Sequence, residues 1–95
     1  MAHLDVRVIP IGTQTAGVSE YIRRAVDVAR QSGLSYAVTP TSTCLEGPLD
    51  RIVEVGLQMH EACFEGDVAR VVTTLTIDDR RDQHETLEDK LTRVE

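Results

Sequence analysis

Hydroxyl-bearing and acidic side chains gather in the middle of the chain, in residues 39–47, which read Thr-Pro-Thr-Ser-Thr-Cys-Leu-Glu-Gly. A hydroxyl group both donates and accepts hydrogen bonds, so Thr39 and Thr43 could hold a small polar ligand. The same residue types also form turns and helix caps, which is the simpler explanation for any one of them. A binding function therefore depends on several of these side chains converging in space.

Glu46 is the acidic residue of this stretch and stands directly before Gly47 and Pro48. A carboxylate can accept hydrogen bonds from a ligand and offset a positive charge on it. It can equally stabilise the positive N-terminal end of a following helix, or pair with His3 or Arg51. Both interpretations of Glu46 remain open.

The remaining reactive side chains give weak patterns for catalysis. His60 and Cys63 are three residues apart, a spacing compatible with a metal, but His84 or Cys44 would have to complete the site, and core packing explains them better. Cys44 could be a nucleophile activated by a histidine, yet no neighbouring motif supports this and a buried strand thiol is usually inert. We therefore predict no metal site, no cofactor and no enzymatic activity.

Size and charge restrict the class of protein. With 95 residues the chain is expected to form a single domain, residues 1–95. Its net charge of −6 disfavours nucleic acids and anionic membranes as partners. The two cysteines lack disulfide-framework spacing, nothing in the first residues looks like a leader peptide, and no apolar run reaches about 18 residues. We therefore expect a soluble cytoplasmic protein with reduced thiols.

Hydrophobic periodicity predicts alternating strands and helices. Period-two alternation indicates strands over 3–11, 34–39, 43–46 and 68–77. Spacing of three and four predicts helices over 18–32, 49–65 and 84–94. In the first helix, the expected apolar stripe is Val18, Ile22, Ala25, Val26 and Ala29. Pro10 is expected to end the first ladder or to cause a bulge, because it cannot donate to a neighbouring strand.

This order, β-α-β-β-α-β plus a C-terminal helix, predicts a ferredoxin-like α+β fold. Right-handed crossovers give a four-stranded antiparallel sheet of order 4-1-3-2 with both main helices on one face. The other face would carry apolar as well as polar residues, namely Arg7, Ile9, Val72, Thr74 and Thr76. Such a surface is too apolar to face water alone, so we predict an obligate homo-oligomer.

In this topology, four candidate ligand-binding residues lie at one end of the sheet: Thr13, Ser19, Thr39 and Thr43. Unpaired N–H groups at the start of the first helix would add to them, with Ser19 as a reasonable N-cap and Thr15 as the alternative. Glu46 falls at the opposite end of the third strand. A ligand could contact both groups across an interface between subunits.

Several segments resemble the small thiamine-binding proteins of the MTH1187/YkoF-like (UPF0045) group, and the match runs along essentially the whole chain. They are residues 8–13 (VIPIGT), 18–22 (VSEYI), 45–48 (LEGP), 59–61 (MHE), 70–74 (RVVTT), 78–80 (DDR) and 89–90 (DK). The resemblance implies a ferredoxin-like subunit, dimers assembled into homotetramers, and binding of thiamine or its hydroxymethylpyrimidine part. It does not imply catalysis.

The function expected is therefore a cytoplasmic, non-enzymatic homo-oligomer that binds thiamine or a related pyrimidine. In this view Thr13, Ser19, Thr39 and Thr43 hydrogen-bond the ligand, and Glu46 compensates its positive charge. The alternative is a structural or interaction protein that assembles through its open sheet face and holds no small ligand.

Overall fold

The computed structural model describes residues 1–12, 18–65, 68–82 and 88. Within these ranges the chain forms, in order, β1 (Ala2–Ile11), α1 (Val18–Gln31), β2 (Ser35–Val38), β3 (Thr43–Gly47), α2 (Leu49–Ala62) and β4 (Arg70–Asp79). The C-terminal helix predicted over 84–94 lies outside the described residues, apart from Glu88.

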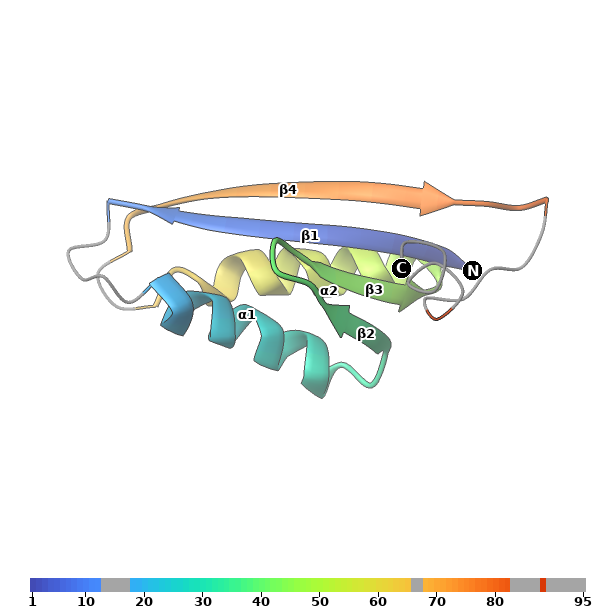
Figure 1. The fold of residues 1–95 in the computed structure, drawn as a ribbon, viewed down its shortest axis with the longest axis horizontal. Coiled ribbons are helices and arrows are strands. Elements are labelled where there is room, and N and C mark those ends of the chain that lie inside the picture. The colour runs from blue at the N-terminus through green and yellow to red at the C-terminus, as the bar shows by residue number, and fades with distance from the viewer. Residues whose placement is uncertain (13–17, 66–67, 83–87, 89–95) are drawn as a thin grey trace.

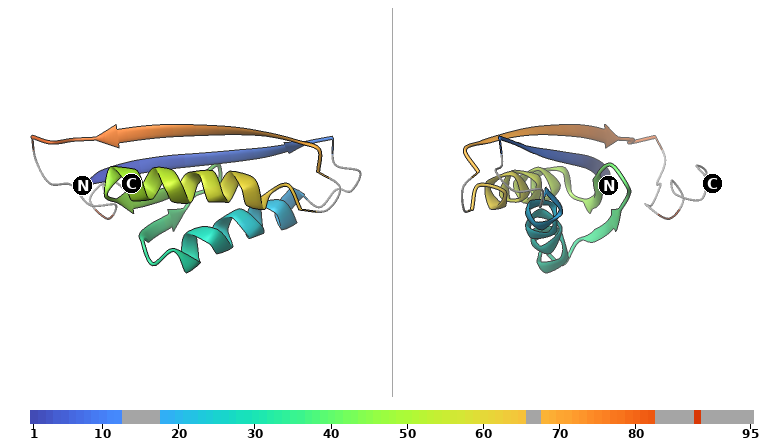
Figure 2. Two further views of the ribbon diagram at one scale, coloured as in Figure 1. Left: turned by 180° about the vertical axis from the view of Figure 1, so that it is seen from behind. Right: turned by 60° about the vertical axis from the view of Figure 1, so that its left-hand side comes forward.

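The strands form one antiparallel sheet in the order β2-β3-β1-β4. This is the predicted order 4-1-3-2 seen from the other edge, so the α+β ferredoxin-like arrangement is confirmed. Figure 1 shows the long β1 and β4 lying side by side, with the short β2 and β3 at the other edge. Both helices cover the same side of the sheet, as the two views of Figure 2 show.

The expectation for Pro10 is wrong. The ladder between β1 and β4 runs from Ala2 opposite Asp79 to Ile11 opposite Arg70, and Pro10 pairs with Val71 within it. β3 accompanies β1 only as far as Val6, which lies opposite Thr43. Beyond that point β1 has a single neighbour among the described strands, and a proline is tolerated on such an edge.

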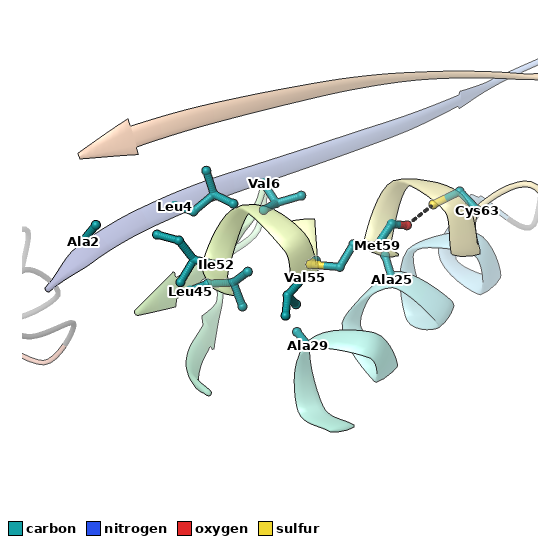
Figure 3. Packing of buried hydrophobic residues seen from close by; sticks show 10 residues of the cluster. All are labelled: Ala2, Leu4, Val6, Ala25, Ala29, Leu45, Ile52, Val55, Met59 and Cys63. Carbon is teal, nitrogen blue, oxygen red and sulfur yellow. Dashed lines mark hydrogen bonds between the residues drawn. The ribbon is translucent and has the colours of Figure 1, made fainter. Parts of the chain in front are cut away.

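The core lies between the sheet and the helices (Figure 3). Among the described residues, its fully buried part contains Ala2, Leu4, Val6, Ala25, Ala29, Leu45, Ile52, Val55, Met59 and Cys63. Small residues bring the layers close together. A Cβ atom added to Gly56 of α2 would lie 2.8 Å from a terminal methyl carbon of Leu4, so this glycine allows α2 to approach β1.

The buried stripe of α1 differs from the predicted one. Tyr21, Ala25 and Ala29 are buried, whereas Ile22 is 40% exposed. Both positions fit a helical repeat, so the sequence does not decide between them. In the structure the backbone of α1 at Tyr21 lies close to the end of α2, where the Cys63 thiol donates to the Tyr21 carbonyl oxygen over 3.7 Å.

The ends of the helices follow local signals. Ser32 caps α1 by donating from Oγ to the Ala29 carbonyl oxygen at 2.6 Å, and Gly33 follows with a φ of +80°. This confirms Gly33 as the residue that ends the helix, because glycine adopts positive φ without steric cost. α2 ends at Ala62, three residues before the predicted limit of 65.

The face away from the helices carries alternate residues of β1 and β4, as predicted. Arg7 lies opposite Thr74, and Ile9 lies opposite Val72. Ile9 is 47% exposed and Val72 is 39% exposed. We call this surface the open face.

Candidate functional site

A small cavity opens where α1 passes the turn between β2 and β3. It encloses about 70 Å³, which is room for several water-sized groups. Its walls are apolar side chains from β1, α1, β2 and α2: Val6, Val8, Ile22, Ala25, Val38 and Met59. Its rim is the turn itself, residues 39–43. The site therefore combines an apolar interior with a hydroxyl-rich edge.

Thr39 shapes this rim through its own hydroxyl group. Its Oγ1 accepts from the backbone N–H of Ser42 at 3.0 Å and from that of Thr41 at 3.3 Å. It also lies 3.0 Å from Ser42 Oγ and 3.1 Å from the Ser42 carbonyl oxygen. These contacts are typical of turns built around a threonine side chain. Thr39 lines the cavity and at the same time holds the turn in shape.

Thr43 is the more deeply placed hydroxyl of the rim. It begins β3, lies opposite Val6 of β1 and Val38 of β2, and is 5% exposed. Its alternation with Leu45 directs both side chains to the helix side of the sheet. Two predicted ligand-binding residues, Thr39 and Thr43, thus meet in one cavity.

Asp5 anchors the turn from the other side of the sheet, and the sequence analysis did not single it out. Its Oδ1 accepts from Ser42 Oγ at 2.5 Å and from Cys44 Sγ at 3.3 Å. An acidic residue within the period-two pattern of β1 is the sequence signal that could have identified it. The interaction fixes residues 42–44 against β1 and so fixes the position of the rim.

The remaining candidates are not brought to this rim by the described residues. Thr13 and Thr15 lie outside the described residues, and only the backbone of Ser19 is described. Because α1 already contains Val18, Ser19 lies inside the helix and is not its N-cap. The end of β1 is not part of the cavity either, since the turn lies beside Val6 and Val8.

Glu46 lies on the other face of the sheet. It pairs in register with His3 of β1 and Ser35 of β2, one residue out of phase with the inward-facing Leu45. The half-buried Glu46 side chain therefore belongs to the open face, and one subunit does not bring it to the cavity. Arg51, one predicted partner, instead pairs with Glu54 at 2.8 Å and donates to the Ser32 carbonyl oxygen.

Comparison with known proteins places the whole chain in one family. The family model described as "Thiamine-binding protein" matches residues 4–95. The chain is 40% identical over 98 residues to the UPF0045 protein YqgV of Bacillus subtilis, covering 99% of this chain and 94% of that protein. The chain belongs to the thiamine-binding protein family. This confirms the family resemblance seen in the sequence.

Solved structures of relatives have the same fold. MJ1052 of Methanocaldococcus jannaschii aligns with a TM-score of 0.86 at 35% identity, covering 98% of this chain and 94% of that one. A Thermotoga maritima protein provisionally assigned to thiamine biosynthesis or salvage aligns with a TM-score of 0.83 at 23% identity, covering 99% and 98%. At that identity the second match supports the fold alone. The arrangement of the four strands and two helices is thus common to this chain and to both solved structures.

The reactive side chains of this family member lie apart from one another. Cys44 is on the open face beside Asp5. His60 is on the helix side, where its Nδ1 lies 2.6 Å from Thr73 Oγ1. The Cys63 thiol is buried and donates to the Tyr21 and Met59 carbonyl oxygens. The described residues contain no group of three or more potential metal ligands.

A larger and more open hollow of about 420 Å³ lies between the two helices, lined by Val28, Gln31, Ser32, Arg51 and Gln58. Its one charged side chain, Arg51, is already engaged by Glu54. Among the helices of the described residues, none is long and apolar enough to cross a membrane.

Proposed function

We propose that this protein binds thiamine, or the hydroxymethylpyrimidine part of thiamine, in the cavity between α1 and the β2–β3 turn. The observation that carries the proposal is the apolar cavity with a hydroxyl rim in a member of the thiamine-binding family. An aminopyrimidine ring has apolar faces and hydrogen-bonding edges, and this combination matches such a cavity. Binding requires no bond to be made or broken, so the protein acts without catalysis.

The size of the cavity favours the pyrimidine part as the group that enters it. Sites that enclose a whole drug-sized ligand usually measure about 300–1,000 Å³, whereas this cavity is about 70 Å³. The thiazolium ring of thiamine would then lie outside the rim. Glu46 of a second subunit could offset the charge of that ring, because in its own subunit Glu46 faces the other side of the sheet.

Calorimetry with thiamine and with hydroxymethylpyrimidine tests the proposal. We expect Thr43→Val to weaken binding roughly 3- to 10-fold, the effect of one net hydrogen bond, because valine keeps the shape of threonine without its hydroxyl. The matched control is Thr73→Val, which removes a hydroxyl on β4, away from the cavity. We expect this variant to keep the wild-type affinity. Absence of heat for both ligands at millimolar concentration would contradict the proposal.

We further propose that the protein is a cytoplasmic homo-oligomer whose subunits cover each other's open faces. Ile9 and Val72 support this, because large apolar side chains in adjacent strands form a continuous exposed patch. This assembly would also be the whole function if no ligand binds.

Light scattering should show a mass above that of one chain. Ile9→Glu should reduce this mass, whereas Arg23→Glu on the exposed surface of α1 should leave it unchanged. A wild-type monomer would refute the assembly but leave ligand binding to be judged by calorimetry.

A further inference from the structure

The two flanks of α2 are unequally covered. On one flank, Val55 and Met59 are buried beside α1. On the other flank, Leu49 is 38% exposed, Leu57 is 54% exposed and Phe64, just beyond the helix, is 37% exposed. This second flank points toward β4, because His60 on the same side contacts Thr73 of β4.

The helix side of β4 continues this flank with apolar residues that pack against the core but stay partly exposed, among them Val71 and Leu75. β4 is an edge strand of the described sheet, and its inward-facing residues are half-buried at best, with Ile77 52% exposed. Together they form one surface, which we call the α2–β4 surface: Leu49, Val53, Leu57, Phe64, Val71, Leu75 and Ile77. The α2–β4 surface lies along the flank of α2 opposite the flank that α1 covers.

We propose that the α2–β4 surface binds residues 84–94 of a second copy of this chain. Leu87, Leu91 and Val94 recur at i, i+4 and i+7, the spacing of an apolar helical stripe. Glu88, the one described residue between 83 and 95, has helical conformation and an exposed side chain. Exposure is expected there, because Glu88 lies outside the apolar stripe. A helix of this pattern would supply the cover that α1 gives to the other flank.

The path of the chain after β4 favours a second copy over the same chain. β4 ends at Asp79, and Figure 1 shows the chain leading onward past the end of the sheet. Asp79 pairs with Arg81 at 2.8 Å and Arg80 pairs with Asp82 at 2.9 Å, contacts between alternate residues that suit an extended backbone. Three extended residues advance about 10 Å, whereas an eleven-residue helix is about 16 Å long. A helix returning to its own subunit would therefore reach Ile77 but not Leu57.

Charge sets the direction in which the segment lies. Helical periodicity places Lys90 and Arg93 on one side of the apolar stripe and Glu88 on the other. The outer edge of α2, next to Leu57, carries the exposed acids Glu61 and Glu54, the second of which also pairs with Arg51. Lys90 and Arg93 face these acids when the segment runs parallel to α2, whereas the reverse direction would bring Glu88 against them. In this direction we place Leu91, the middle residue of the apolar stripe, beside Leu57, the most exposed residue of the α2 flank.

Disulfide formation between two different chains tests both the surface and the source of the segment. One full-length chain carries Leu57→Cys, a second carries Leu91→Cys and a size tag, and both carry Cys44→Ser, while Cys63 is buried. After the chains are mixed by unfolding and refolding and then oxidised, we expect a disulfide-linked species with the summed mass of the two. Gln58→Cys, on the same helix but outside the α2–β4 surface, replaces Leu57→Cys in the control and should link at least tenfold less.

A single chain carrying both Leu57→Cys and Leu91→Cys separates the remaining outcomes. Linkage within one chain, with none between the mixed chains, would assign the segment to its own subunit and overturn the proposal. No linkage in either experiment, with both samples folded by circular dichroism, would overturn it as well. Linkage from Gln58→Cys equal to that from Leu57→Cys would show random collision and would also count against it.

Discussion

The two faces of the sheet are built from the same strands yet differ in how they are buried. On the helix side, Leu4 and Val6 of β1 are almost completely buried, whereas Ile9, on the open face of the same strand, is 47% exposed. Side chains of similar hydrophobicity thus have different surroundings according to their place in the period-two repeat. One subunit provides two helices among its described residues, and these cover one face. The folding of one subunit buries the helix side between α1 and α2, whereas the open face and the α2–β4 surface are left for association.

Truncation of Met59 should produce the largest change. Met59→Ala removes a side chain that is 1% exposed, and such core truncations lower the free energy of unfolding by about 2–5 kcal/mol. Ile9→Ala, the matched change on the open face, should cost less than about 0.5 kcal/mol in dilute protein. Urea titration measures both, and equal losses at low concentration would show that the two faces do not differ as described.

Gly56→Ala should have an intermediate effect. The added Cβ would lie 2.8 Å from Leu4 Cδ2 and 3.4 Å from Leu75 Cδ2, and crowding of a packed core costs about 1–3 kcal/mol. This outweighs the gain of about 1 kcal/mol that alanine brings to a helix, so a small net loss of stability is expected in urea titration. Leu4→Val removes the crowded methyl position, and the double variant should lose less than the sum of the single variants. An increase in stability for Gly56→Ala alone would contradict the close approach of α2 to β1.

The comparison between the two thiols, Cys44 and Cys63, should involve the smallest change in the free energy of unfolding. It should nevertheless show a clear difference in chemical reactivity. Burial raises the pKa of the Cys63 thiol, and the positive charge of Arg24 partly opposes this shift. The Cys63 thiol therefore keeps its proton to higher pH in the folded protein than in the unfolded chain. The protonated thiol contributes fully to the stability of the fold below the unfolded thiol pKa of about 8.5. This contribution is lost as the pH rises from there through the higher pKa of the folded state. Urea titrations between pH 7 and 10 should show this decline, and Cys63→Ala should flatten it.

Thiol labelling of the folded protein provides the companion measurement. At pH 8 the half-buried Cys44 should react before the buried Cys63, and Cys44→Ser should remove the early phase. Simultaneous labelling of both thiols in the native protein would show that the helix side is more open than the packing around Cys63 indicates.

Much of the fold could be predicted from the sequence because the local patterns were strong. Alternation in β1 gave its two faces, and Gly33 ended α1 at its expected place. The failures occurred where two local choices were nearly equal. Tyr21 and Ile22 both suit a helical stripe, and only the rotation of α1 in the folded structure decides that Tyr21 is the buried one. Pro10 was expected to interrupt a ladder because the sequence does not show that β3 stops pairing at Val6.

The candidate site was predicted less completely than the fold. Thr39 and Thr43 meet in one cavity because the hairpin turn brings them to the same side of the sheet. Glu46 lies on the opposite face because it follows Thr43 by three residues, an odd number, in an alternating strand. The role of Asp5 was missed because its contacts with Ser42 and Cys44 join residues separated by 37 and 39 positions in the chain.

The sequence by itself determined the order of the elements, the face of each strand and the hydroxyl-rich turn, because these depend on residues near one another in the chain. Tertiary structure decided which flank of α2 is covered, how α1 is rotated and where the turn meets β1. Those features arise from contacts between distant segments, whose energies depend on how side-chain shapes fit together and cannot be read from local periodicity.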